Sequence, residues 1–177
     1  MILTGSAIVQ AVRAREIEID PFDLVFLNPN SYNFHLFREI IRIDPAVQRS
    51  ITGDTFTIDD RGILLEPGKL YLAATEEVIG SSKYAMTLLG RSSMGRLGLF
   101  INITADLGHA GSVSRWTLEL TVVQPLRVYG GMTLGQVAFW SQCGLPSEYF
   151  GCYWGDLKPV ACRDHRLEIM NVHRLQE

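Results

Sequence analysis

Residues 90–99 read GRSSMGRLGL, and a second segment, WTLEL at residues 116–120, follows shortly afterwards. The first segment combines small residues with two hydroxyls and two guanidiniums. Its backbone N–H groups and arginines suit an anionic ligand, so we interpret it as a small ligand-holding loop. The second segment has the pattern of a β-strand that aims one carboxylate, Glu119, toward whatever the loop holds. Glu119 is therefore a candidate general base.

Alternation along residues 115–123 places Glu119 on one face of that strand. Trp116, Leu118 and Leu120 alternate with Thr117 and Glu119, and a period of two sends successive side chains to opposite faces. Periodicity alone leaves open a solvated surface glutamate. The 90–99 segment taken alone is equally open to being a turn whose serines bond their own backbone.

The remaining sequence predicts many short strands after one short helix. The helix begins after Thr4 or Ser6 and ends before the strand-like segment 17–19. Turn residues separate the later segments of strand character, which are 23–27, 31–36, 39–43, 55–58, 62–65, 69–75, 84–89, 100–105, 115–123, 126–129 and 134–140. This pattern predicts a mainly β barrel or sandwich in one domain, residues 1–177.

Composition narrows the classes of function. The net charge of −3 argues against a general nucleic-acid binder, which needs a basic face. Three cysteines (Cys143, Cys152 and Cys162) form no CxxC pair, which favours a reducing compartment. We expect neither a secretory leader nor a membrane span, because residues 1–19 lack a basic segment followed by a long apolar run, and no stretch of the sequence approaches the length of a membrane span. We therefore expect a cytoplasmic protein with no membrane partner.

Familiar catalytic motifs are absent from the sequence. Neither the GxxxxGK[ST] phosphate loop nor the GxSxG elbow occurs. The zinc deaminase signature needs H-x-E, and none of His35, His109, His165 and His173 begins one. We expect no protein-bound metal, so any hydrolytic chemistry here would proceed without zinc.

Taken together, the two segments and several others resemble the dCTP deaminase family, part of the dCTP deaminase and dUTPase superfamily. The further motifs are TA at 104–105, GM at 131–132 and QVAF at 136–139, with weaker matches of NSYNFHL at 30–36 and YFGCY at 149–153. The resemblance covers most of the chain. It implies a distorted β-barrel of the dUTPase-like (β-clip) type, and a homotrimer whose active sites are shared between neighbouring subunits.

The resemblance also implies roles for individual residues. Glu119 would activate the attacking water and move protons, while Ser92 and Arg96 position that water and stabilise negative charge. Mg²⁺ would accompany the nucleotide phosphates without being held by the protein. The residues implied in nucleotide binding are Arg91, Ser93, Ala105, His109, Gln136, Tyr149, Tyr153 and Lys158. The default reaction is dCTP plus water giving dUTP plus ammonia.

Departures from the family pattern surround the sugar and phosphate positions. His109 and Ser112 replace an aspartate and a sugar-stacking aromatic, and Cys152 and Asp156 replace a phosphate-binding lysine and glutamine. A deaminase for a ribonucleotide, a monophosphate or a modified pyrimidine therefore remains open, as does a non-catalytic nucleotide-binding homologue. Asn33, where the superfamily usually has aspartate, makes dUTPase activity less expected. Residues 143–177 are expected to form a C-terminal lid or tail.

Overall fold

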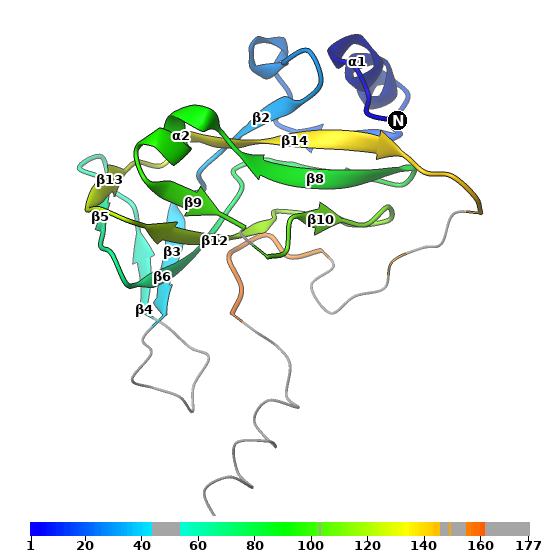
Figure 1. The fold of residues 1–177 in the computed structure, drawn as a ribbon. Helices are drawn as coiled ribbons and strands as arrows, with labels where there is room; N and C mark the ends of the chain where they lie inside the picture. The colour runs from blue at the N-terminus through cyan, green and yellow to red at the C-terminus, as the bar shows by residue number, and fades with distance from the viewer. Residues whose placement is uncertain (44–53, 103, 146–148, 150–154, 162–177) are drawn as a thin grey trace, which may run out of the picture.

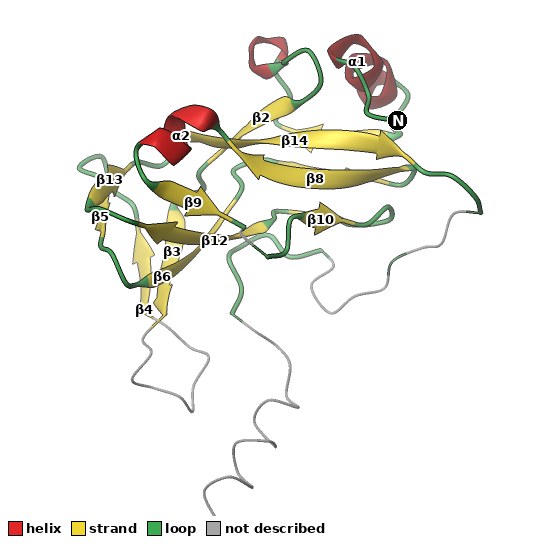
Figure 2. Cartoon of the chain, viewed as in Figure 1, coloured by secondary structure: helices red, strands yellow, loops and turns green. Residues whose placement is uncertain are grey.

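The computed structural model describes residues 1–43, 54–102, 104–145, 149 and 155–161, and these form a mainly β structure. Paired strands of the described residues are antiparallel and form four sheets (Figures 1 and 2). In spatial order, the three-stranded sheet contains β1 (Ile17–Asp20), β7 (Val78–Ser81) and β11 (Val113–Ser114), and the two-stranded sheet contains β13 (Leu126–Val128) and β5 (Ile63–Leu65). The four-stranded sheet contains β10 (Leu107–Gly108), β8 (Tyr84–Gly90), β14 (Thr133–Ser141) and β2 (Tyr32–His35). The five-stranded sheet contains β4 (Asp54–Thr57), β3 (Glu39–Ile43), β6 (Leu70–Ala74), β12 (Thr117–Val122) and β9 (Leu99–Ile101).

Helix α1 (Gly5–Arg13) begins where the sequence predicts it. The hydroxyl of Thr4 accepts a hydrogen bond from the backbone N–H of Ala7 at 3.4 Å, which caps the helix. Ile8 and Ala11 are buried on its inner side. The prediction of a mainly β fold with a short N-terminal helix is therefore confirmed. None of the helices in the described part of the chain is long and apolar enough to cross a membrane.

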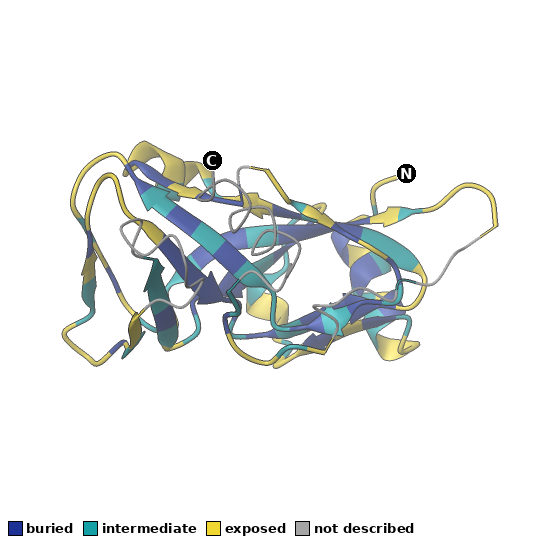
Figure 3. Cartoon of the chain, turned by 90° about the horizontal axis from the view of Figure 1, so that it is seen from below, coloured by how far each residue is buried: buried dark blue, intermediate teal, exposed yellow. Residues whose placement is uncertain are grey.

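The core is rich in large side chains, many of them from the four-stranded and five-stranded sheets, and α1 and the three-stranded sheet also contribute to it. Tyr32, Phe34 and Phe139 come from the first of these sheets and Tyr71 from the second, and each is at most 2% exposed. In Figure 3 the buried segments concentrate on the strands, while the connecting turns are exposed. Burial of this size supplies the main stabilising term of the fold.

A pair of ionisable side chains is buried at the end of β2. The Nδ1 atom of His35 lies 2.5 Å from Oε1 of Glu77, and Oε2 of Glu77 accepts a hydrogen bond from the backbone N–H of His35 at 2.9 Å. Their side chains are 10% and 2% exposed. The ring of Phe26 packs edge-on against His35, with centroids 4.2 Å apart. The pair therefore ties β2 to the segment that precedes β7.

The predicted strand at 23–27 is wrong, because Leu24–Phe26 forms the short 3-10 helix η1. The carboxylate of Asp23 accepts a hydrogen bond from the backbone N–H of Val25 at 3.0 Å, which starts the turn. The hydroxyl of Tyr32 accepts another from the N–H of Asp23 at 2.9 Å, and burial raises the pKa of this hydroxyl. Local side-chain bonds thus override the apolar strand pattern.

Three strands were not predicted: β7, β10 and β11. Gly80 reads as a turn residue in the sequence, yet it lies within β7 and pairs with Val113. A Cβ atom at position 80 would lie 2.4 Å from the carbonyl oxygen of Ser112. The glycine is therefore needed for close approach of two backbones, a use of glycine that resembles a turn signal in sequence.

Candidate active site

Glu119 lies in the middle of β12, between β6 and β9. It is paired with Leu72 of β6, while Leu120 is paired with Ile101 of β9. Burial alternates along β12, so Leu118 and Leu120 are buried and Glu119 is half-buried on the opposite face. The predicted period of two is confirmed. Because β12 is an interior strand of its sheet, the backbone below the Glu119 side chain is paired on both sides.

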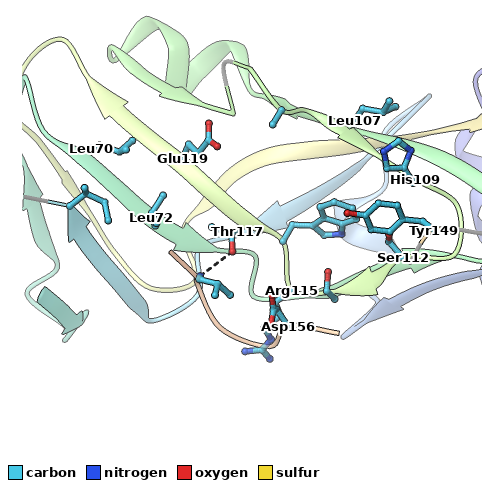
Figure 4. A pocket seen from close by; sticks show the side chains of 15 residues that line it. Leu70, Leu72, Leu107, His109, Ser112, Arg115, Thr117, Glu119, Tyr149 and Asp156 are labelled. Carbon is cyan, nitrogen blue, oxygen red and sulfur yellow. Dashed lines mark hydrogen bonds between the residues drawn. The ribbon is translucent and has the colours of Figure 1, made fainter. Parts of the chain in front are cut away.

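A cavity of about 660 Å³ opens over this face of β12 (Figure 4). Glu119 lines the cavity, and its carboxylate forms no hydrogen bond or ion pair with any other residue that the structure describes. An unpaired carboxylate in a mainly apolar pocket is available to exchange protons with a bound molecule. The cavity is lined by Ile43, Leu70, Leu72, Ala105, Leu107, His109, Ser112, Ser114, Arg115, Trp116, Thr117, Glu119, Tyr149, Asp156 and Val160.

One wall of the cavity is built by the turn at residues 109–112. The backbone N–H of Ser112 donates to the carbonyl of His109 at 3.2 Å, and Gly111 has a φ of 93°, a conformation that glycine adopts without strain. The His109 ring stacks on Tyr149 with centroids 4.8 Å apart. Two residues predicted to bind the nucleotide therefore meet at the cavity.

Ser112 adds an unsatisfied polar group to this wall. Its side chain belongs to a residue that is 4% exposed, and its hydroxyl oxygen has no hydrogen-bond partner in the described part of the molecule. A buried hydroxyl without a partner costs about 1–3 kcal/mol. A ligand group that bonds to Ser112 would recover this cost.

The described C-terminal segment, residues 155–161, contributes Asp156 and Val160 to the lining of the cavity. The backbone N–H of Arg115 donates to the carbonyl of Asp156 at 2.8 Å, and that of Val160 donates to the hydroxyl of Thr117 at 3.2 Å, the dashed line in Figure 4. This part of the predicted tail is thus hydrogen-bonded to Thr117 of β12 and to Arg115, which precedes β12. The larger part of the 143–177 prediction lies outside the described residues.

Arg115 is a cavity residue that the sequence reasoning missed. Its guanidinium lies over the ring of Phe37, 4.2 Å from the centroid, and its buried Nε atom has no hydrogen-bond partner among the described residues. A signal for it was present, because Arg115, Thr117 and Glu119 share one face under the period of two. Leu70 and Leu72, which lie on β6 beside Glu119, carry no such signal.

Ser92 and Arg96 do not line this cavity. They lie on the short helix α2 (Ser92–Arg96), which follows β8 and packs beside β9 (Figure 1). The predicted loop conformation is therefore wrong for residues 92–96, which are helical, while the ligand-holding role of this segment stays a prediction. The backbone N–H of Gly95 donates to the carbonyl of Arg91 at 3.0 Å, so these main-chain groups are used within the helix.

The other predicted binding residues are also distributed unevenly. Ala105 lines the cavity, whereas Arg91 and Ser93 lie with α2 outside it. The amide oxygen of Gln136 on β14 accepts a hydrogen bond from Ser31 at 2.7 Å, and Lys158 forms a 2.7 Å ion pair with Glu39. Tyr153 lies outside the described residues.

Comparison with known proteins gives a consistent family. A family model described as dCTP deaminase-like matches residues 2–142. A Clostridium botulinum protein named "dCTP deaminase, dUMP-forming" is 43% identical over 142 residues, covering 78% of this chain and 82% of its own length. A protein of the same name from Leptospira biflexa is 41% identical over 152 residues, covering 84% and 87%, and a Rhodopirellula baltica "dCTP deaminase" is 41% identical over 147 residues, covering 81% and 74%.

Among solved structures, the 2'-deoxycytidine 5'-triphosphate deaminase from Agrobacterium tumefaciens has a similar fold. The TM-score is 0.64 at 20% sequence identity, and the match covers 78% of this chain and 46% of the solved chain. This likeness supports the fold class expected from the sequence.

Proposed function

The chain belongs to the dCTP deaminase-like family, and on that premise we propose that it removes the amino group of a cytosine nucleotide by hydrolysis, with dCTP as the default substrate. Glu119 carries the proposal, because it lines the cavity and its carboxylate has no partner among the described residues. A binding protein without catalysis has no need of such a group. The non-catalytic alternative is therefore less well supported.

The proposed reaction moves two protons through Glu119. The carboxylate takes a proton from water as the water oxygen bonds to C4 of cytosine, and passes this proton to the ring nitrogen N3. It then takes the proton of the new hydroxyl and gives it to the amino nitrogen. The bond from C4 to that nitrogen breaks, ammonia leaves, and C4 keeps the oxygen as a carbonyl. No zinc takes part in this proposed scheme.

Ser92 and Arg96 are proposed to position the water and to stabilise the negative charge that develops on the ring. Because α2 lies outside the Glu119 cavity of one chain, a neighbouring subunit would supply them. Four apolar side chains on and around α2 and β9 are exposed in the single chain: Leu89, Leu97, Phe100 and Val123. A cluster of exposed apolar side chains is typical of a surface that is buried against another subunit. We therefore propose a homotrimer with shared active sites.

Shared sites make a mixing experiment decisive. Glu119→Gln and Arg96→Gln should each be inactive alone, whereas co-expression of both should restore about a quarter of the wild-type sites, since two intact halves meet in one of four random pairings. Ammonia release by purified mixed oligomers measures this. A mixture as inactive as its two components would show that the residues do not meet across a subunit boundary.

The nucleotide is proposed to lie with its base near Ala105 and Glu119 and its sugar near His109 and Tyr149. Arg91, Ser93, Gln136, Tyr153 and Lys158 remain proposed contacts to the rest of the nucleotide. The described residues contain no group of three or more His, Cys, Asp or Glu that could hold a metal ion. Mg²⁺ is proposed to accompany the nucleotide, bound to its phosphate oxygens, whose charge it neutralises.

A second candidate product is dUMP, because the Clostridium and Leptospira relatives are named as dUMP-forming. The sequence favours dUTP as the default, since Asn33 stands where an acid would organise diphosphate hydrolysis. The amide oxygen of Asn33 accepts a hydrogen bond from Asn28 at 2.8 Å. Product analysis separates the two outcomes, since dUMP formation releases pyrophosphate in amounts equal to ammonia.

A nucleotide panel tests the proposed function. dCTP should release ammonia, and dCMP, CTP, 5-modified dCTP and dUTP should be compared with it for both ammonia and pyrophosphate. CTP belongs in the panel because the unpartnered hydroxyl of Ser112 is suited to bond a sugar hydroxyl. Absence of ammonia from every cytosine nucleotide would overturn the proposal, and tight binding without turnover would favour the non-catalytic alternative.

A further inference from the structure

Asn102 has an unusual backbone conformation directly beside Glu119. It follows β9, is 8% exposed, and has a φ of 45°, in the left-handed region that Asn tolerates better than most residues. Among non-glycine residues of the described chain, Arg15 is the other with a positive φ. Arg15 is exposed at the end of α1, whereas Asn102 is buried, so surrounding contacts must hold Asn102 in this conformation.

Those contacts are two reciprocal hydrogen bonds to the main chain of Glu119. The backbone N–H of Asn102 donates to the carbonyl of Glu119 at 3.1 Å. The backbone N–H of Glu119 donates to the side-chain Oδ1 of Asn102 at 2.9 Å. Both peptide groups of the Glu119 residue are therefore fixed by this single residue.

The position of Asn102 explains why a side chain is needed for the second bond. The register of β9 on β12 is Ile101 opposite Leu120, so Asn102 is the first residue beyond the strand. Its left-handed φ is not that of a strand, and its amide side chain supplies the acceptor in place of a further strand carbonyl. Without the Asn102 side chain, the backbone N–H of Glu119 would have no hydrogen-bond acceptor.

We propose that Asn102 is a positioning residue that fixes the direction in which Glu119 presents its carboxylate to the substrate. Asn102 does not line the cavity, so it acts through Glu119 and touches no substrate atom. This inference rests on the proposed function, because it assumes that Glu119 transfers protons. Proton transfer requires the carboxylate within hydrogen-bond reach of the water and the ring, and a displacement of about 1 Å costs on the order of 100-fold in rate.

Two substitutions separate the side chain from the backbone conformation. Asn102→Gly keeps the left-handed conformation and removes the acceptor, so kcat for ammonia release should fall about 10- to 100-fold while KM changes less than about threefold. Asn102→Asp keeps an acceptor oxygen at the same distance and should retain more activity than Asn102→Gly. Arg15→Gly is the matched control, because it makes the same kind of change at the exposed left-handed residue, and its kinetics should equal those of wild type.

Amide hydrogen exchange gives a second readout that needs no turnover. Exchange of the peptide containing Glu119 should be faster in Asn102→Gly than in wild type, and unchanged in Arg15→Gly. The inference is overturned if kcat of Asn102→Gly stays at the wild-type value, or if KM alone changes. Wild-type protein that releases no ammonia from any cytosine nucleotide would instead overturn the proposed function, so the two failures are distinguishable.

Discussion

Replacing Glu119 by glutamine is expected to lower the rate of ammonia release by about 10²- to 10⁴-fold. Glutamine has nearly the shape of glutamate but cannot accept and return a proton. Since the carboxylate has no hydrogen bond or ion pair to lose within the described structure, folding should be unaffected. Steady-state kinetics with dCTP and the unfolding midpoint in denaturant measure the two effects.

Glu18→Gln provides the matched control, because Glu18 is exposed on β1 and lies outside the cavity. It should keep wild-type kinetics and stability. If Glu119→Gln retained more than about a tenth of the wild-type rate, another group would have to serve as the base. If Glu119→Gln were unfolded under the assay conditions, its loss of activity would be due to loss of structure, and the claim that folding is unaffected would be wrong.

Replacing His35 by alanine is expected to give a large loss of stability, about 3–5 kcal/mol in the free energy of unfolding. The substitution leaves the carboxylate of Glu77 buried at 2% exposure without its ring partner. It also removes the ring that Phe26 packs against. Chemical denaturation at a fixed protein concentration measures the loss.

The partner variants of this pair distinguish the causes of the loss. Glu77→Gln keeps an oxygen for the backbone N–H of residue 35, so it should cost less than His35→Ala. The double variant His35→Ala with Glu77→Gln should be more stable than the sum of the two single losses predicts, because the double variant no longer contains the unpaired buried carboxylate that His35→Ala leaves. Additive losses, or a loss below about 1 kcal/mol for His35→Ala, would show that the pair contributes little.

The parts of the fold that were predicted correctly have short-range signals. The alternation of β12 follows from side-chain order alone, and the start of α1 follows from one capping residue. The parts that were wrong depend on specific contacts, some of them local and others between distant segments. Leu24–Phe26 turns because of Asp23 and the hydroxyl of Tyr32, and Gly80 belongs to a strand because Ser112 approaches it. The alternation of apolar and polar residues, on which the strand predictions were based, indicates none of these contacts.

The site divides in the same way. The face of β12 that carries Glu119 could be predicted from its strand pattern, and Ala105, His109 and Tyr149, which the resemblance implied in nucleotide binding, line the same cavity. Arg115 was missed although alternation pointed to it. The role of Asn102 depends on a backbone angle and on a side chain bonding 17 residues along the chain, and neither has a signature in composition or periodicity.

The cavity residues stand on two kinds of backbone, an interior strand and a turn, and this difference decides which of them can be changed in a redesign. Glu119 stands on an interior strand, whereas His109 to Ser112 form a turn joined to the neighbouring sheet by main-chain bonds, such as that from Gly111 to Ser81 at 2.7 Å. Turns exchange side chains more readily than interior strands do. A library of variants confined to this turn, grafted onto an unchanged sheet, would therefore be the natural starting point for engineering a new nucleotide preference.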